Sequence, residues 1–124
     1  MITHTIFYVR NQEISTLFYQ KLLNLEPVLN VPGMTEFKLS EHHILGLMPE
    51  SGISRLLGSS IGSPAQPHDF PKAELYFRVT DPEKMFKLAT EIGGKELSPV
   101  LSRDWGNRAG YVMDQDGHVL AFSD

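Results

Sequence analysis

Two hydrophobic periodicities alternate along the chain. Residues 2–9 alternate with a period of two, so that every second side chain shares a face, and they are rich in β-branched and aromatic types. This pattern predicts a strand. Between Asn11, a suitable helix N-cap, and Asn24, which can end a helix in a left-handed conformation, apolar residues recur at helical spacing. Three more strands are expected after this helix, at about 26–31, 34–40 and 42–48. This half of the chain therefore predicts the order strand–helix–strand–strand–strand.

The second half repeats this order about seventy residues later, which indicates two copies of one supersecondary unit. His4 to Val9 is matched by Glu74 to Val79, and Asn11 is matched by Asp81. The repeated elements are a strand at 73–79, a helix between Asp81 and Gly93, and strands at about 96–101, 108–113 and 118–123. Because 124 residues suit one domain, we expect a single α+β domain. Its parts are one module at about 1–49, a linker at about 50–72 and a second module at about 73–124.

The linker at 50–72 differs from both modules because proline, glycine and serine interrupt it repeatedly. Ile53, Leu56, Leu57 and Ile61 could form a short helical turn within it, and His68 is expected to be solvated. A linker of this length is often a lid or a partner arm, but a passive connector is an equally good interpretation.

Composition narrows the classes of function. The net charge is −4 without a basic stretch, so a nucleic-acid partner is not expected. The absence of cysteine excludes disulfides and thiolate metal sites and is compatible with a reducing compartment. The chain opens directly into a strand, and no apolar run approaches the roughly 18 residues of a membrane span, so we expect a cytoplasmic protein without a signal peptide or a membrane partner.

Strand alternation sorts the side chains of each module onto two faces of its sheet. In the second module the apolar Leu75, Phe77 and Val79 are expected to face the helix. The opposite face then carries a mixture of polar, aromatic and small side chains, namely His4, Ile6, Tyr8, Ile44, Gly46, Met48, Glu74, Tyr76, Arg78, Val119, Ala121 and Ser123. Such a mixture is typical of a ligand cleft, although a simply solvated sheet face is the alternative.

Three further residues are candidates for ligand binding or for packing. Arg103, and after it Arg78, could hold an anionic ligand group, because a guanidinium suits carboxylate and phosphate. Either arginine could instead pair with a nearby acid. Trp105, the sole tryptophan, could line the cleft or pack in the core or a dimer interface.

The chain resembles the vicinal oxygen chelate superfamily, which includes glyoxalase I, bleomycin-resistance proteins and extradiol dioxygenases. The resemblance covers nearly the whole length. It is carried by the paired strand–helix openings, by Phe18-Tyr19 with Leu22-Leu23, by Gly93-Gly94, and by a closing segment with Arg103-Asp104-Trp105-Gly106, Gly110-Tyr111 and Asp114-Gln115-Asp116-Gly117-His118. It implies two tandem βαβββ modules whose sheets form a U around a cleft, with the helices on the outer face.

The resemblance also implies where a metal would bind, because metal-dependent members place ligands on the first and last strand of each module. Here the first-strand positions fall on His4 and Glu74, while the last-strand positions fall on Gly46 and Ala121, which have no donor side chain. Two protein ligands make a poor site for zinc, nickel or iron. We therefore expect no tightly bound cofactor, with a weakly held divalent metal as the alternative.

The favoured hypothesis is a glyoxalase/bleomycin-resistance-like protein, expected as a homodimer, that binds a small organic molecule in its cleft. Its ligand contacts would come from Tyr8, Met48, Tyr76, Arg78, Arg103 and Trp105. The alternative is a metal-dependent lyase, isomerase or dioxygenase that uses His4 and Glu74, or an enzyme in which Glu74 is a metal-free general base. A non-catalytic structural or regulatory role is the third hypothesis.

Overall fold

The computed structural model describes residues 1–62 and 70–124, and the chain divides into two compact units between residues 67 and 68. The first unit contains β1 (Thr3–Val9), α1 (Gln12–Leu23), β2 (Leu29–Val31), β3 (Met34–Ser40), β4 (His43–Pro49), α2 (Glu50–Leu57) and the 3₁₀ helix η1 (Gly58–Ile61). The second contains β5 (Glu74–Arg78), α3 (Pro82–Glu91), β6 (Lys95–Ser102), β7 (Arg108–Met113) and β8 (Val119–Ser123). The predicted α+β fold with two tandem βαβββ modules is thus confirmed.

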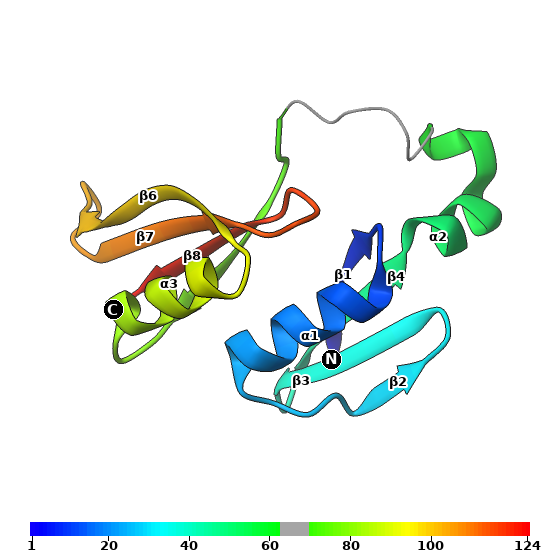
Figure 1. The fold of residues 1–124 in the computed structure, drawn as a ribbon, viewed down its shortest axis with the longest axis horizontal. Coiled ribbons are helices and arrows are strands. Elements are labelled where there is room, and N and C mark those ends of the chain that lie inside the picture. The colour runs from blue at the N-terminus through cyan, green and yellow to red at the C-terminus, as the bar shows by residue number, and fades with distance from the viewer. Residues whose placement is uncertain (63–69) are drawn as a thin grey trace. The chain divides into compact units, whose positions relative to one another are not determined.

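The sheet of the first unit has the strand order β1-β4-β3-β2 (Figure 1). β1 and β4 pair in parallel, which requires a crossover connection, whereas β3 pairs antiparallel with β4 and with β2. The helix α1 covers one face of this sheet, and the two layers bury a shared set of apolar side chains, namely Phe7, Val9, Phe18, Tyr19, Leu22, Phe37, Leu45 and Leu47. The face opposite α1 is called the open face below.

Local side-chain chemistry fixes the ends of both module helices as predicted. The Asn11 carboxamide accepts a bond from the Ile14 amide at 3.0 Å, and the Asp81 carboxylate accepts one from the Lys84 amide at 3.0 Å. Asn24 ends α1 with a φ of 52°, in the left-handed region. These bonds satisfy amide groups that the first helical turn cannot pair internally.

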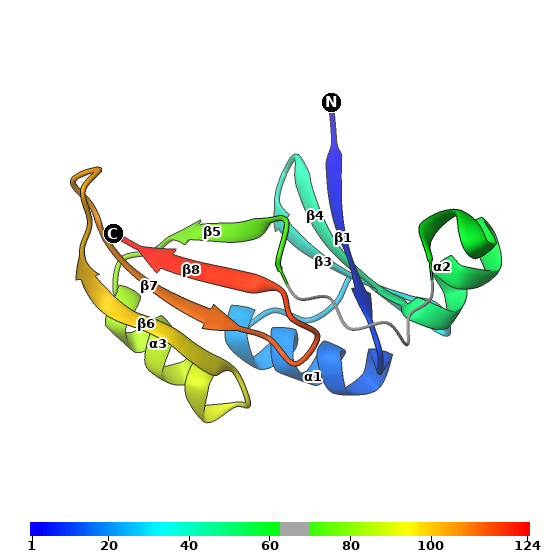
Figure 2. The same cartoon turned by 90° about the horizontal axis from the view of Figure 1, so that it is seen from above.

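The second unit repeats the arrangement with the strand order β5-β8-β7-β6. Figure 2 shows α3 lying against one face of its sheet. Phe122 and Leu120 of β8 and Val112 of β7 are fully buried with Ala89 of α3. The open face of this unit is again the one opposite the helix.

Two predicted boundaries change. The strand expected at 26–31 is reduced to Leu29–Val31, because Pro27 has no amide to donate and the Glu26 carboxylate instead accepts a bond from the Gln20 side chain at 2.9 Å. The start of the linker forms α2 and η1, with Ile53 buried while Leu56, Leu57 and Ile61 stay exposed. Residues 63–69 of the predicted linker, with His68 among them, lie outside the described residues.

Among the described residues, every helix is too short or too polar to cross a membrane. The prediction that the two modules enclose a cleft stays a prediction.

Candidate functional site

Exposure confirms the predicted sorting of side chains on the first strand of each module. On β1, Phe7 and Val9 are buried toward the helix, while His4, Ile6 and Tyr8 are exposed on the open face. On β5 the same alternation leaves Glu74, Tyr76 and Arg78 exposed. Each open face therefore starts from the residues that the sequence predicted for it.

The open face of the second unit carries three aromatic side chains, Tyr76, Trp105 and Tyr111, which we call the aromatic cluster. Tyr76 and Tyr111 both pair in register with Ala121, which is fully buried on β8 between their two strands. The Trp105 indole Nε1 donates to the Tyr76 hydroxyl at 3.3 Å, although 56% of Trp105 is exposed. The structure therefore brings the predicted residues Tyr76 and Trp105 together and adds Tyr111 to them.

Arg103 lies against the same cluster, with its guanidinium carbon 5.2 Å from the centre of the Tyr111 ring. Its Nε and Nη2 donate to the Ala109 carbonyl at 3.0 and 2.8 Å. Nη2 also donates to the Ser98 hydroxyl at 2.8 Å and to the Pro99 carbonyl at 2.9 Å. Arg103 is thus bonded within its own β6–β7 hairpin, and the acidic partner considered from the sequence is not among these acceptors.

Glu74 and Tyr111 interact electrostatically on this face. The pKa of the Tyr111 phenol is raised, chiefly because burial disfavours the phenolate and further because the Glu74 carboxylate and Tyr76 lie nearby, while Arg103 opposes the shift. Tyr111 therefore stays protonated at neutral pH and can donate a hydrogen bond to a ligand. The sequence did not place Tyr111 in the site, because its alignment with Ala121 depends on the register of β7 and β8.

Arg78 lies at the end of β5, where its Nε donates to the Asp124 carbonyl at 3.3 Å. On the first unit, Tyr8 is exposed and Met48 half-buried on the open face, as predicted. These three residues occupy the expected faces of their own units.

The first unit brings together a pair that the sequence did not predict. His4 Nδ1 lies 3.7 Å from the Glu36 carboxylate, which comes from β3. Glu36 pairs in register with Gly46, and Gly46 with Ile6, so the two side chains reach each other across β4 on the open face. At this separation the two groups are close neighbours but not hydrogen-bonded.

The two last-strand positions that the resemblance implies for metal ligands carry no donor side chain. A side chain at Gly46 would meet Ile6 Cγ1 at 3.2 Å and Met34 Sδ at 3.3 Å from its first carbon, so packed apolar atoms already fill that position. Ala121 has no donor and is fully buried. Within residues 1–62 and 70–124, no group of three or more histidine, aspartate or glutamate side chains is arranged to hold an ion.

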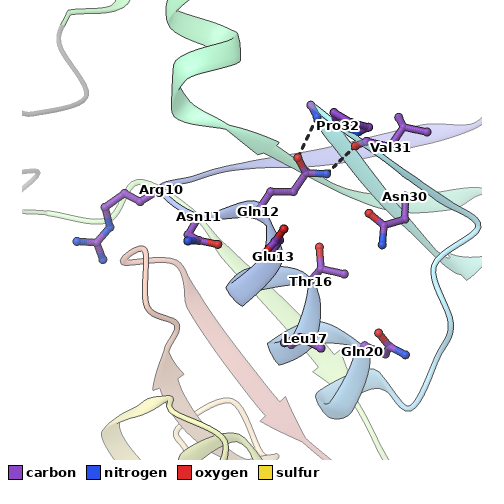
Figure 3. Close-up of a pocket in the computed structure, with 11 residues that line it drawn as sticks. Arg10, Asn11, Gln12, Glu13, Thr16, Leu17, Gln20, Asn30, Val31 and Pro32 are labelled. Carbon is purple, nitrogen blue, oxygen red and sulfur yellow. Dashed lines mark hydrogen bonds between the residues drawn. The ribbon is translucent and has the colours of Figure 1, made fainter.

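A separate pocket of about 800 Å³ lies beside α1 in the first unit, and none of the predicted site residues lines it (Figure 3). Gln12 closes one end of it, because its Nε2 donates to the Val31 carbonyl at 2.8 Å and its Oε1 accepts from the Gly33 amide at 2.9 Å. Thr16 and Asn30 line the pocket further along. Its lining mixes polar and apolar surface, and no sequence motif marked it.

Comparison with known proteins addresses the family and the fold. The family model described as "Glyoxalase/Bleomycin resistance protein/Dioxygenase superfamily" matches residues 1–122. None of the curated proteins matches the chain.

Several solved structures share the fold at low sequence identity. A glyoxalase-related enzyme from Fulvimarina pelagi is 19% identical, with a TM-score of 0.82 over 99% of this chain and 86% of that one. A glyoxalase/bleomycin resistance protein/dioxygenase family enzyme from Burkholderia phytofirmans PsJN is 12% identical, with a TM-score of 0.83 over 97% and 94%. TioX from Micromonospora sp. ML1 is 15% identical, with a TM-score of 0.71 over 99% and 97%. At these identities the likeness concerns the fold alone.

Proposed function

The chain belongs to the Glyoxalase/Bleomycin resistance protein/Dioxygenase superfamily, and we propose that it binds a small aromatic molecule on the open face of its second unit, without a tightly bound metal. The superfamily fold alone does not decide this, because one fold hosts several chemistries. The proposal therefore depends on the residues of the site.

The observation that carries the proposal is the aromatic cluster. Trp105 is more than half exposed, yet its indole is held by the Tyr76 hydroxyl, and Tyr111 is held beneath the Arg103 guanidinium. Aromatic rings supply a large contact area, and rings that are already fixed lose little conformational entropy on binding. A flat ring that stacks on this cluster would gain contact area at a small cost in conformational entropy.

Polar groups around the cluster would orient the ligand. Glu74 can accept a hydrogen bond, and the protonated Tyr111 can donate one. Arg78, on the same open face, is a further proposed contact. Tyr8 and Met48 are proposed contacts for a ligand on the open face of the first unit. A mainly apolar surface with a few directed polar groups is typical of small-molecule sites.

One specific observation favours an enzyme as the second candidate. The Glu36 carboxylate lies 3.7 Å from the His4 ring, and a carboxylate next to a histidine is a common support both for metal ligation and for proton transfer. The alternative is thus a metal-dependent lyase, isomerase or dioxygenase using His4 and Glu74, or metal-free base catalysis by Glu74. The filled position at Gly46 and the missing donor at Ala121 argue against the metal-dependent version.

Titration of Trp105 fluorescence tests the binding proposal, because this residue is the sole tryptophan. The probes are para-nitrobenzyl alcohol, para-nitrobenzoate and para-nitrobenzylamine, which share a quenching ring and differ in charge. We expect saturable quenching by at least one probe and weaker binding in Tyr76→Ala. Linear, unsaturable quenching by all three would refute the proposal.

Metal content separates the two candidates. Protein purified without a metal-chelating tag should contain far less than one transition-metal ion per chain by mass spectrometry. A nearly stoichiometric metal that is lost in His4→Ala, and not in the matched control His42→Ala, would favour the enzyme.

We also propose a cytoplasmic homodimer. The lack of cysteine is compatible with a reducing compartment, and exposed apolar side chains such as Ile14 and Leu17 on α1 offer surface for a second copy. Light scattering should give a mass near twice 14.0 kDa, and a mass of one chain at micromolar concentration would contradict the dimer.

A further inference from the structure

We propose that Arg103 is a positioning residue that fixes the aromatic cluster, so that the site selects ligands by ring stacking and not by negative charge. This inference rests on the proposed function, and it replaces the expectation that Arg103 would hold an anionic ligand group. Three features of the β6–β7 hairpin carry it.

The first feature is an irregularity in the β6–β7 ladder. Ser98 pairs with Tyr111, but the next pair is Leu101 with Ala109, so three steps on β6 correspond to two on β7. Pro99 lies within the shift and has no amide to donate. A bulge of this kind leaves backbone groups that the ladder does not pair. The Arg103 side chain supplies donors at this point, to the Pro99 and Ala109 carbonyls.

The second feature is that these bonds occupy one edge of the Arg103 guanidinium. Nε and Nη2 form the pair of donors that would grip a carboxylate side-on, and both are directed at the Ala109 carbonyl. Nη2 is shared with the Ser98 hydroxyl and the Pro99 carbonyl as well. An anion bound side-on through Nε and Nη2 would have to take these donors from two backbone carbonyls, and a carbonyl left without a donor costs stability. The bonds described for Arg103 do not use Nη1, so the argument concerns this side-on edge of the guanidinium.

The third feature is the tight turn at the end of the hairpin. The Arg103 amide donates to the Asn107 carbonyl at 2.9 Å, and the Gly106 amide donates to the Arg103 carbonyl at 3.0 Å. Gly106 has a φ of +99°, a conformation that favours glycine, and it closes a tight turn with Trp105 at its tip. Arg103 thus binds the turn through its backbone and contacts Tyr111 through its side chain, which links the two outer members of the cluster.

Three variants separate positioning from charge. Arg103→Lys keeps the positive charge but lacks the planar fork, and Arg103→Gln removes the charge. Ser98→Ala removes one acceptor of the Arg103 side chain without changing any charge. Ser102→Ala is the matched control, since this serine lies on the same strand, one residue from the turn, and is exposed.

The three nitro-aromatic probes, which have equal rings and different charges, give the decisive binding measurement. Positioning predicts that Arg103→Lys and Arg103→Gln both weaken every probe that binds the wild type, by a common factor of about fivefold or more. Ser98→Ala should weaken the same probes by a smaller common factor, and Ser102→Ala should change none. If Arg103→Lys retains para-nitrobenzoate while Arg103→Gln loses that probe alone, Arg103 is an anion ligand and the inference is overturned.

Trp105 fluorescence anisotropy in the ligand-free protein provides a second measurement that needs no binding. It should fall in Arg103→Lys and in Ser98→Ala at unchanged thermal unfolding, because the turn is less firmly held, and stay constant in Ser102→Ala. Unchanged anisotropy in both folded variants would refute positioning. A wild type that binds no probe but shows these anisotropy changes would refute the proposed function and leave the role of Arg103 supported.

Discussion

Gly46 gives the sharpest test of why the family's metal position is blank in this chain. Its neighbours across the open face are Ile6 of β1 and Met34 of β3, whose atoms would lie 3.2 and 3.3 Å from an added methyl group. These contacts are tighter than ordinary van der Waals spacing, so Gly46→Ala requires Ile6 or Met34 to shift. The position is therefore tightly packed as well as lacking a donor.

The magnitude follows from two opposing effects. Forcing a methyl group into a packed position costs about 1–3 kcal/mol. Replacing glycine by alanine at a φ that alanine tolerates recovers about 0.4–1 kcal/mol, because the unfolded chain loses freedom. We expect Gly46→Ala to lower the free energy of unfolding by roughly 1 kcal/mol, with the flexible Met34 side chain absorbing part of the strain.

A double-mutant cycle with Met34→Ala isolates the steric contribution in urea unfolding. In the Met34→Ala background the added methyl group has room, so Gly46→Ala should become neutral or stabilising, with a coupling energy of about 1 kcal/mol. Gly52→Ala is not a suitable control, because it contacts Met48, whereas Ser102→Ala changes an exposed residue and should be neutral. If Gly46→Ala is neutral in the wild-type background, the position is open, and a ligand-bearing side chain could have occupied it.

Three further predictions concern the helix ends, the pocket beside α1 and the alkaline limit of stability. Asn11→Ala and Asp81→Ala should each lower the free energy of unfolding by about 1 kcal/mol, because each removes the acceptor for a first-turn amide. Asn11→Ser can still cap the helix, so it should retain most of the wild-type stability in urea denaturation. Gln12→Ala should cost about 1–2 kcal/mol and expose the Gly33 amide to faster hydrogen exchange, and unchanged exchange there would contradict the bridging role. Because the pKa of Tyr111 is raised in the folded protein, the unfolded chain loses this proton first as the pH rises. The associated stability is complete below the ordinary tyrosine pKa of 10.0 and is lost as pH rises through the folded value. Tyr111→Phe should therefore flatten the fall in stability above pH 10, and an unaltered fall would exclude this cause.

The sequence predicted the features that depend on neighbouring residues. Asn11 and Asp81 cap their helices because a cap requires only a short acceptor side chain and the next three residues. The faces of β1 and β5 followed from alternation alone, which holds wherever one face of a strand is buried.

Features that depend on cross-strand register could not be predicted in the same way. His4 and Glu36 meet only because β1, β4 and β3 align Ile6 with Gly46 and Gly46 with Glu36, over separations of up to forty residues in sequence. Tyr111 joins the site for the same reason, through its alignment with Ala121. The partners of Arg103 depend on a bulge in β6, which alternation cannot reveal.

The two blank positions differ in what replaces the missing donor, and this difference connects the fold to the proposed binding. At Gly46 the aliphatic and thioether atoms of Ile6 and Met34 lie close to where a side chain would begin. At Ala121 a small side chain is fully buried between two strands that carry tyrosines, so Tyr76 and Tyr111 occupy neighbouring positions of one face. Neither position offers a donor for a metal, but the second brings rings of the aromatic cluster together. The proposed recognition of a ring by the second unit rests on this arrangement, while the first unit contains the His4–Glu36 pair.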